Sequence, residues 1–164
     1  MSREKILSID KLMEVVDKLK KSNKKIVTTN GIFDILHIGH VRYLQDAKKW
    51  GDILVVCVNS DVSTKKIKGP QRPLNNENDR AEMLAALQCV DYVTIFAEEN
   101  PIKILGIIKP DIHVKGGDYQ PDQLVEADTV RKNGGEVHIQ HKIEGYSTTR
   151  FIHTIMDRFK DKKI

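Results

Sequence analysis

Residues 28–40 read TTNGIFDILHIGH, and this stretch contains the features that decide the fold. It begins inside the apolar run KKIVTTN, residues 24–30, which is typical of a short buried strand, and Asn30-Gly31 is a turn signal. The helical sequence HVRYLQDAKKWG, residues 40–51, follows and ends at a glycine. A strand, a turn and a helix in this order form the junction at which α/β proteins bind ligands.

The same alternation of strand and helix continues along the whole chain. Further strands are expected at 52–60 (DILVVCVNS), 91–96, 111–115 and 136–140, and helices at 9–22, 77–88, 101–108, 121–133 and 149–160. The segment KGPQRPLNN, residues 68–76, is expected to be a loop. The pattern predicts an α/β fold with a Rossmann-like, doubly wound sheet of about five parallel strands. We expect a single domain over residues 1–164, with the helix at 9–22 packed on the sheet.

Composition limits the classes of protein that fit. The chain has 164 residues, 40% of them hydrophobic, which suffices for one domain with a full core. No apolar run reaches the roughly 18 residues of a membrane helix, and the first ten residues do not resemble a signal peptide. Cys57 and Cys89 lie among apolar neighbours, as expected of reduced thiols in a cytoplasmic protein. The net charge of +4 suits anionic substrates, and the lysine clusters lack the interleaved aromatics of a nucleic-acid site.

The two histidines of the opening stretch suggest its chemistry. His37 and His40 are three residues apart, so they share one side of the first helical turn and can both donate to one phosphate. Gly39 between them keeps that surface low, and Gly31 permits a backbone conformation that a side chain would forbid. Free amides at the turn and the helix start can face an anion. The arrangement predicts stabilisation of charge on an α-phosphate during nucleotidyl transfer.

Rival phosphate-binding motifs do not occur in the sequence. It contains no G-x-x-x-x-G-K-[ST], no G-x-G-x-x-G after a strand and no H-E-x-x-H. A bare H-x-G-H is a weak signal, and its position after a buried strand and an Asn-Gly turn makes it informative. A nucleotide-sensing module without catalysis and a tRNA-handling domain remain as alternatives from other classes.

At this point the motifs resemble a known family. Strand, NGIFD and HIGH are similar to the cytidylyltransferase-like nucleotidyltransferases, which carry the H-x-G-H motif. The likeness continues in order through VNSD (58–61), KGPQRPLN (68–75), DRAEMLAAL (79–87), KPDIHVKGGDY (109–119) and EGYSTT (144–149). This set most resembles heptose 1-phosphate adenylyltransferases, including the adenylyltransferase domain of the bifunctional heptose kinase/adenylyltransferases.

The resemblance implies a reaction and its participants. ATP and D-glycero-D-manno-heptose 1-phosphate would give ADP-heptose and pyrophosphate, with Mg²⁺ carried on the ATP phosphates and no metal site of the protein itself. The product would feed the inner core of lipopolysaccharide or a related surface glycan. A homodimer is implied by family likeness alone, and neither nucleic acid nor membrane is an expected partner. The sugar kinase domain of the bifunctional relatives has no counterpart among these motifs.

Site residues follow from the matching positions. His37 and His40 match the catalytic pair, and Lys68 in its Gly-Pro loop is a candidate phosphate clamp. Three polar residues are assigned to the substrate phosphate or sugar: Asp34, which could instead brace the turn, Arg72 and Arg80. Arg80 opens a helix, where a cation opposes the helix dipole, so it needs an anionic partner, either a ligand phosphate or a neighbour such as Asp79 or Glu77. The expected nucleotide-binding residues are Asn30, Gly31, Ile32, Phe33, Gly39, Lys115, Gly116, Gly117, Asp118, Glu144, Gly145, Tyr146, Ser147 and Thr148.

Departures from the pattern bear on the substrates. Glycerol-phosphate cytidylyltransferases have Arg-Thr-Glu-Gly-Ile-Ser at the last motif, whereas residues 142–147 read KIEGYS here, which points away from CTP. Ile32 stands where heptose enzymes have cysteine, so the sugar pocket could differ. The nearest rival activities are a cytidylyltransferase for a polyol phosphate and an FMN adenylyltransferase.

Overall fold

The computed structural model describes residues 2–117, 120–140 and 145–160. Its five strands are β1 (Ile26–Gly31), β2 (Ile53–Asn59), β3 (Tyr92–Phe96), β4 (Ile112–Gly116) and β5 (Glu136–Gln140). The α-helices are α1 (Ile9–Lys21), α2 (Ile38–Lys48), α3 (Asp61–Lys68), α4 (Glu77–Ala85), α5 (Ile102–Ile108), α6 (Ala127–Lys132) and α7 (Thr148–Phe159). Two 3₁₀ turns, η1 (Ser2–Lys5) and η2 (Pro121–Gln123), complete the described elements.

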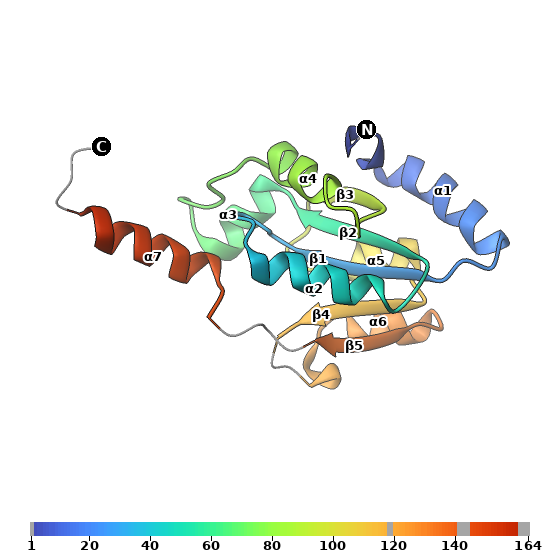
Figure 1. The fold of residues 1–164 in the computed structure, drawn as a ribbon. Coiled ribbons are helices and arrows are strands. Elements are labelled where there is room, and N and C mark those ends of the chain that lie inside the picture. Colours follow the sequence, from blue (N-terminus) through green and yellow to red (C-terminus); the bar gives the residue numbers. More distant parts are fainter. Residues whose placement is uncertain (1, 118–119, 141–144, 161–164) are drawn as a thin grey trace.

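All five strands pair in parallel in the order β3-β2-β1-β4-β5, which confirms the predicted doubly wound sheet (Figure 1). The chain first winds outward from β1 through β2 to β3, and then crosses back to β4 on the other side of β1. The strand order therefore reverses between β1 and β4. At such a switch point the loops leaving neighbouring strands diverge and open a crevice beyond their carboxyl ends.

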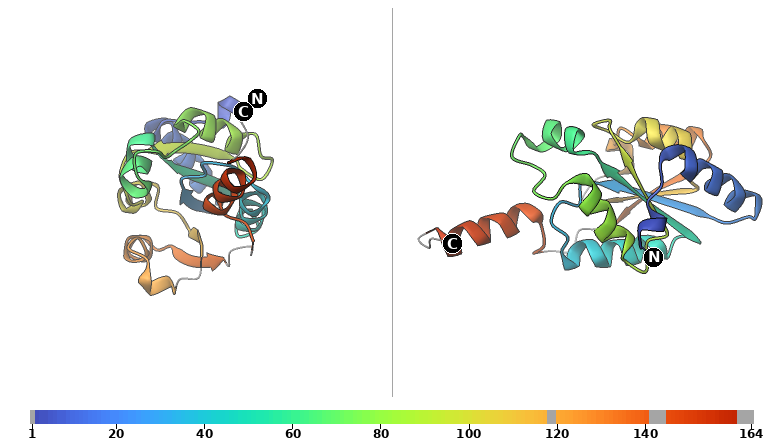
Figure 2. Two further views of the ribbon diagram at one scale, coloured as in Figure 1. Left: turned by 90° about the vertical axis from the view of Figure 1, so that its left-hand side faces the viewer. Right: turned by 90° about the horizontal axis from the view of Figure 1, so that it is seen from above.

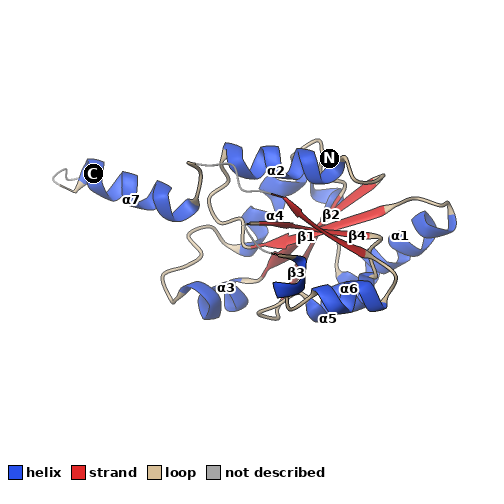
Figure 3. Ribbon diagram, turned by 90° about the horizontal axis from the view of Figure 1, so that it is seen from below, coloured by secondary structure: helices blue, strands red, loops and turns tan. Residues whose placement is uncertain are grey.

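Helices cover both faces of the sheet, and each face has its own core (Figure 3). Leu54, Val56 and Val58 of β2 pack with side chains of α2 and α4. Val55 and Cys57 of the same strand pack with side chains of α1, α5 and α6. Successive side chains of a strand point to opposite faces, which explains why β2 reads as one continuous apolar run.

Two helical regions differ from the expectation. Helix α3, residues 61–68, was not predicted; Ser60 caps it by accepting a hydrogen bond from the Ser63 amide. The expected helix over 121–133 is divided into η2 and α6, because Leu124 between them is extended. Glu126, the N-cap residue of α6 just after this break, is 2% exposed. Periodicity alone does not reveal a break of this kind, since both pieces continue a helical pattern.

Helix α7 projects from one end of the body and buries none of its residues (Figure 2). Its apolar side is exposed at Phe151, Ile155, Met156 and Phe159. Across the parts of the chain that the structure describes, no helix combines the length and apolar character needed to cross a membrane.

Candidate active site

A cavity of about 290 Å³ opens at the end of β1 and β4, at the switch point of the sheet. Its walls come from the β1 turn, the start of α2, the end of β4 and the start of α7, which are far apart in the sequence. The lining residues are Asn30, Gly31, Ile32, Phe33, His37, Gly39, His40, Tyr43, Lys115, Gly116, Tyr146, Ser147 and Thr148. Twelve of these thirteen were expected from the sequence, and Tyr43 was not.

His37 and His40 lie face to face at the start of α2. Their ring centroids are 3.8 Å apart and the rings are nearly parallel, at 14°. His37 is the N-cap of the helix, and its Nδ1 accepts a hydrogen bond from the His40 amide at 3.4 Å. A neutral His37 that accepts at Nδ1 carries its proton on Nε2. This Nε2 is buried with no partner among the described residues, so it is a donor available to a ligand.

Both histidines are weaker bases than a free imidazole. Burial lowers the pKa of His37, since a charged ring loses its solvation there. Burial, with a smaller contribution from the charge of His37, lowers the pKa of His40 to about 4. Near neutral pH the pair is therefore uncharged in the absence of ligand. An anionic phosphate beside the rings would raise both pKa values and favour N–H donation.

The backbone at the turn leaves little room for additional atoms. A Cβ on Gly39 would lie 3.0 Å from both His37 Nδ1 and the Tyr146 Cβ, and one on Gly31 would lie 2.9 Å from the Phe33 ring. Phe33 adopts a left-handed backbone conformation, with φ of 49°, and its ring meets His40 edge to face at 5.2 Å. Phe33 is 7% exposed and belongs to the core while also lining the cavity. The two glycines therefore leave the room that the Phe33 and His37 rings and Tyr146 occupy.

A buried polar network forms the wall of the cavity at β4. Lys115 Nζ donates to Asn30 Oδ1 at 2.9 Å and forms an ion pair with Glu126 Oε1 at 2.8 Å. Behind it, fully buried His113 pairs with the Thr28 hydroxyl at 2.9 Å and lies 3.7 Å from Glu126 Oε1. Glu126 was missed by sequence reasoning, because it lies outside the motifs.

Tyr43 supports the floor between β1 and β4. Its hydroxyl lies 2.6 Å from the Thr29 hydroxyl and donates to the Val114 carbonyl at 2.9 Å. Its position in a predicted helix, three residues after His40, was the only signal in the sequence. Since a Cβ on Gly116 would lie 3.1 Å from the Tyr43 ring, the glycine allows β4 to approach closely.

Asp34 and Arg72 hold the loop that follows α3. Asp34 is 1% exposed and accepts from Arg72 Nε at 2.5 Å and from the Leu74 and Asn75 amides at 2.8 and 3.0 Å. Burial alone would raise the pKa of Asp34, but these amides and the Arg72 guanidinium lower it. Asp34 thus braces the turn, as one reading of the sequence held, and neither residue lines the cavity.

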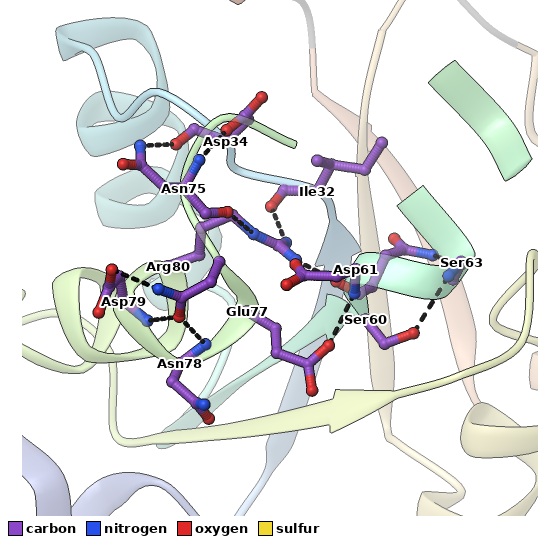
Figure 4. Close-up of polar contacts among 12 residues, drawn as sticks. Ile32, Asp34, Ser60, Asp61, Ser63, Asn75, Glu77, Asn78, Asp79 and Arg80 are labelled. Carbon is purple, nitrogen blue, oxygen red and sulfur yellow. Dashed lines mark hydrogen bonds and ion pairs between the residues drawn. The ribbon is translucent and has the colours of Figure 1, made fainter. Parts of the chain in front are cut away.

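Arg80, expected at a substrate phosphate, is instead a buried tether with no exposed surface (Figure 4). Its guanidinium donates to the carbonyls of Asn75, Ile32 and Asn59 and to Asp61 Oδ1, at 2.5–3.0 Å. Ile32 follows β1, Asn59 ends β2, Asp61 begins α3 and Asn75 precedes α4. The expectation of ligand contact is therefore corrected, because four donors are already engaged by the protein. Helix-dipole reasoning identified the need for an anionic partner, and Asp61 fills that need.

The remaining expected residues lie outside the cavity or outside the described chain. Lys68 ends α3 with an exposed side chain away from the lining. Gly117 is buried, with its amide donating to the Gln140 carbonyl, and Gly145 is exposed with φ of 86°. Asp118 and Glu144 fall outside the described residues, so their assigned roles stay predictions.

Comparison with known proteins places these features in a family. A profile of the cytidylyltransferase-like family matches residues 28–154. The bifunctional protein HldE of Syntrophotalea carbinolica is 46% identical over 156 residues, which are 95% of this chain and 32% of that protein. HldE of Pectobacterium carotovorum is 48% identical over 150 residues, 92% of this chain and 31% of that one. The chain spans about a third of the length of these curated relatives.

Solved structures support the same fold. A lipopolysaccharide core biosynthesis protein from Thermoplasma volcanium superposes with a TM-score of 0.60 at 35% identity, covering 76% of this chain and 99% of that one. A pantoate-beta-alanine ligase from Francisella tularensis superposes with a TM-score of 0.61 at 16% identity, covering 96% of this chain and 79% of that one. The second likeness concerns the fold alone.

Proposed function

This chain belongs to the cytidylyltransferase-like family of nucleotidyltransferases, and we propose that it transfers AMP from ATP to D-glycero-D-manno-heptose 1-phosphate. The observation that carries the proposal is the stacked His37–His40 pair at the switch point, in one cavity with Lys115-Gly116 and with Tyr146 to Thr148. These segments bear the motifs that distinguish heptose 1-phosphate adenylyltransferases from other relatives. The similarity to one third of each HldE protein supports the same assignment.

The reaction needs no covalent bond to the protein. A phosphate oxygen of the sugar 1-phosphate attacks the α-phosphorus of ATP, and the bond from that phosphorus to the bridging oxygen of pyrophosphate breaks. The products are ADP-heptose and pyrophosphate, and the electron pair of the broken bond leaves with pyrophosphate. Charge accumulates on the α-phosphate oxygens in the transition state, which hydrogen-bond donors placed beforehand can stabilise.

The start of α2 supplies such donors. His37 Nε2 is buried without a partner among the described residues, and the helix N-terminus adds its partial positive charge. Ser147 caps α7 by accepting from the Arg150 amide, so its O–H proton remains available to a phosphate oxygen. The Thr148 hydroxyl lies in the same wall of the cavity. Lys68 lies at the end of α3, outside the cavity lining, so it can act as a phosphate clamp only if its side chain moves toward the cavity.

Mg²⁺ is proposed to arrive with ATP. The described residues contain no group of three or more His, Cys, Asp or Glu side chains that could hold a metal ion. The hydroxyls of Ser147 and Thr148 fit an ion that is bound mainly by phosphate oxygens and water, as magnesium usually is. When bound, the ion would neutralise charge on the β- and γ-phosphates.

The test is pyrophosphate release from purified protein and Mg²⁺, with ATP or CTP crossed against heptose 1-phosphate or glycerol 3-phosphate. Release only with ATP and heptose 1-phosphate is expected. Release only with CTP would reassign the nucleotide, and release with ATP and FMN would reassign the acceptor. Nucleotide binding without release from any pair would favour a sensing module.

His40→Ala tests the catalytic assignment in the same assay. We expect turnover to fall at least 100-fold, since one transition-state donor is typically worth that much, while ATP binding stays largely intact. His153→Ala, at an exposed position on α7, is the matched control and should be unaffected. Activity of His40→Ala within tenfold of the wild type would contradict the mechanism.

Further parts of the proposal concern the setting of the enzyme. We propose a cytoplasmic homodimer whose product supplies heptose to lipopolysaccharide core or a related surface glycan. The chain mass is 18.7 kDa, so sedimentation equilibrium should return about twice that value. A monomer at micromolar concentration would contradict the dimer and leave the proposed chemistry unchanged.

A further inference from the structure

We propose that Glu126 is a positioning residue: it holds the Lys115 ammonium in place and cancels its positive charge. Lys115 then donates a hydrogen bond to an uncharged acceptor of a substrate instead of to a phosphate oxygen. The acceptor class is a hydroxyl or a ring nitrogen, carried either by the nucleoside or by the sugar. The inference rests on the proposed function insofar as it takes ATP and a sugar 1-phosphate as the ligands.

Geometry fixes the Lys115 ammonium tightly at the wall of the cavity. Asn30 Oδ1 holds it from β1 at 2.9 Å, and Glu126 Oε1 holds it from the start of α6 at 2.8 Å. Asn30 accepts from one of the three N–H donors of the ammonium and the contact with Glu126 is an ion pair, so at least one N–H donor remains. No other residue in 2–117, 120–140 or 145–160 pairs with Lys115 Nζ, and its side chain is 22% exposed in the lining.

Glu126 faces Lys115 and His113, at 2.8 and 3.7 Å from its Oε1. It is the N-cap residue of α6, yet its side chain makes no capping hydrogen bond. It is 2% exposed, and a buried carboxylate is costly unless it is paired. Burial alone would raise the pKa of Glu126, but the contacts with His113 and Lys115 outweigh burial and lower it to about 2. Glu126 is therefore an anion at neutral pH.

The charge at this wall therefore sums to zero. The positive charge of Lys115 is cancelled by Glu126 at 2.8 Å, and burial lowers the pKa of His113 so that its ring is neutral. A phosphate gains little Coulombic energy from a neutral pair. The unpaired donors for phosphate lie elsewhere in the cavity, at His37 and the start of α2. The cavity therefore has an end that suits anions, at His37, and an electrically neutral end, at Lys115. Lys115 accordingly binds substrate groups other than phosphate.

The experiment compares ATP with inorganic tripolyphosphate, which has the same anionic chain without the nucleoside, by calorimetric titration. Lys115→Met should weaken binding of the ligand that carries the acceptor, ATP or heptose 1-phosphate, about tenfold and change tripolyphosphate binding less than twofold. Lys103→Met is the matched control, because Lys103 pairs with Glu98 at an exposed site, and it should change neither. Equal losses for ATP and tripolyphosphate would identify Lys115 as a phosphate clamp and overturn the proposal.

Glu126→Gln tests the positioning role with a side chain of the same shape. Binding of the ligand that carries the acceptor should weaken about fivefold, whereas tripolyphosphate binding should strengthen about threefold, since Lys115 regains a net charge. A merely structural role would not tighten binding of an anion. On the Lys115→Met background, Glu126→Gln should add less than twofold, because it acts through Lys115. Full additivity, or loss of both ligands in Glu126→Gln, would refute the positioning role.

A second arm identifies the source of the acceptor. Heptose 1-phosphate and inorganic phosphate are titrated in the same variants; a loss confined to the sugar phosphate assigns the acceptor to the sugar, and one confined to ATP assigns it to the nucleoside. If neither ligand loses affinity in Lys115→Met, the proposal is wrong. Wild-type protein that binds ATP without turning over heptose 1-phosphate would remove the proposed function and leave this inference standing on the ATP arm.

Discussion

At the residue scale, His37 and His40 are neutral near pH 7 because the fold desolvates both rings. His40 carries the larger penalty, with a pKa near 4 from burial and from the neighbouring His37 ring. A histidine whose pKa is lower in the folded than in the unfolded chain binds fewer protons when folded. Its contribution to stability is therefore complete above pH 6.5 and is lost as the pH falls toward 4.

His40→Gln should remove this pH dependence. Each pKa unit is worth about 1.4 kcal/mol, so wild-type protein should lose about 3 kcal/mol more unfolding free energy than the variant between pH 7 and pH 4. Urea denaturation at both pH values measures the difference. The comparison with the variant cancels the contributions of His37 and His113, whose pKa values are also lowered by burial. Parallel losses in the two proteins would show that His40 is solvated.

Residue-level prediction succeeded where a motif fixed the backbone and failed where a partner came from elsewhere in the chain. The strand–turn–helix pattern was enough to place His37, Gly39 and His40 in the cavity. Arg80 was correctly identified as needing an anion, but the anion is Asp61, from a helix that was not predicted. Glu126 could not be predicted from the sequence, because its role depends on a break in a helical pattern and on contact with Lys115, eleven positions earlier.

At the element scale, Gly39 lowers the stability of α2 but leaves space at its start for His37 and Tyr146. Alanine is the better helix former by about 1 kcal/mol, but its Cβ would approach both His37 and Tyr146 to 3.0 Å. We expect Gly39→Ala to retain its melting temperature while kcat/KM for pyrophosphate release falls about tenfold. Gly106→Ala in α5 is the control, since the nearest atom is 3.6 Å away, and it should leave kcat/KM unchanged. Full activity of Gly39→Ala would mean that α2 and α7 separate easily.

Arg80 ties three elements together, and a lysine cannot replace it. Lysine lacks the planar fork that reaches the carbonyls of Ile32, Asn59 and Asn75 at once. Arg80→Lys should lower the unfolding free energy by about 2–4 kcal/mol, because buried acceptors and Asp61 lose their donors. Arg131→Lys, in the more exposed pair with Asp122, should cost less than about 1 kcal/mol. Chemical denaturation of both variants checks this, and equal losses would contradict the tether.

The elements themselves were largely predictable because periodicity and hydrophobicity decide them locally. All five strands were expected, and the continuous apolar run of β2 marked it as buried on both faces. Helix α3 was missed because its sequence, DVSTKKIK, is short and has no clear apolar stripe. It forms where the Ser60 cap and the Arg80–Asp61 pair hold its first turn, which are tertiary effects beyond the reach of a local pattern.

At the scale of the whole molecule, α7 lies outside the body formed by the sheet and the other helices. It projects from the body (Figure 1) and buries no residue. Tyr146, Ser147 and Thr148, where the helix begins, nevertheless line the cavity. Removal of α7 should therefore weaken ligand binding without lowering the stability of the fold. The two sheet cores contain no α7 side chain, so we expect them to form without the helix.

A chain that ends at residue 147 tests this expectation. Its melting temperature should stay within about 3 °C of the full chain, because little apolar burial is lost. Its affinity for ATP should fall about fivefold, since Thr148 no longer lines the cavity and Ser147 no longer caps a helix there. A chain ending at residue 160 is the control and should match the full chain in both measurements. A fall in melting temperature of more than 10 °C would show that α7 contributes to the stability of the fold. This would be expected if the apolar side of α7 were covered in the proposed dimer. Sedimentation of both chains would then distinguish loss of the dimer from loss of the fold.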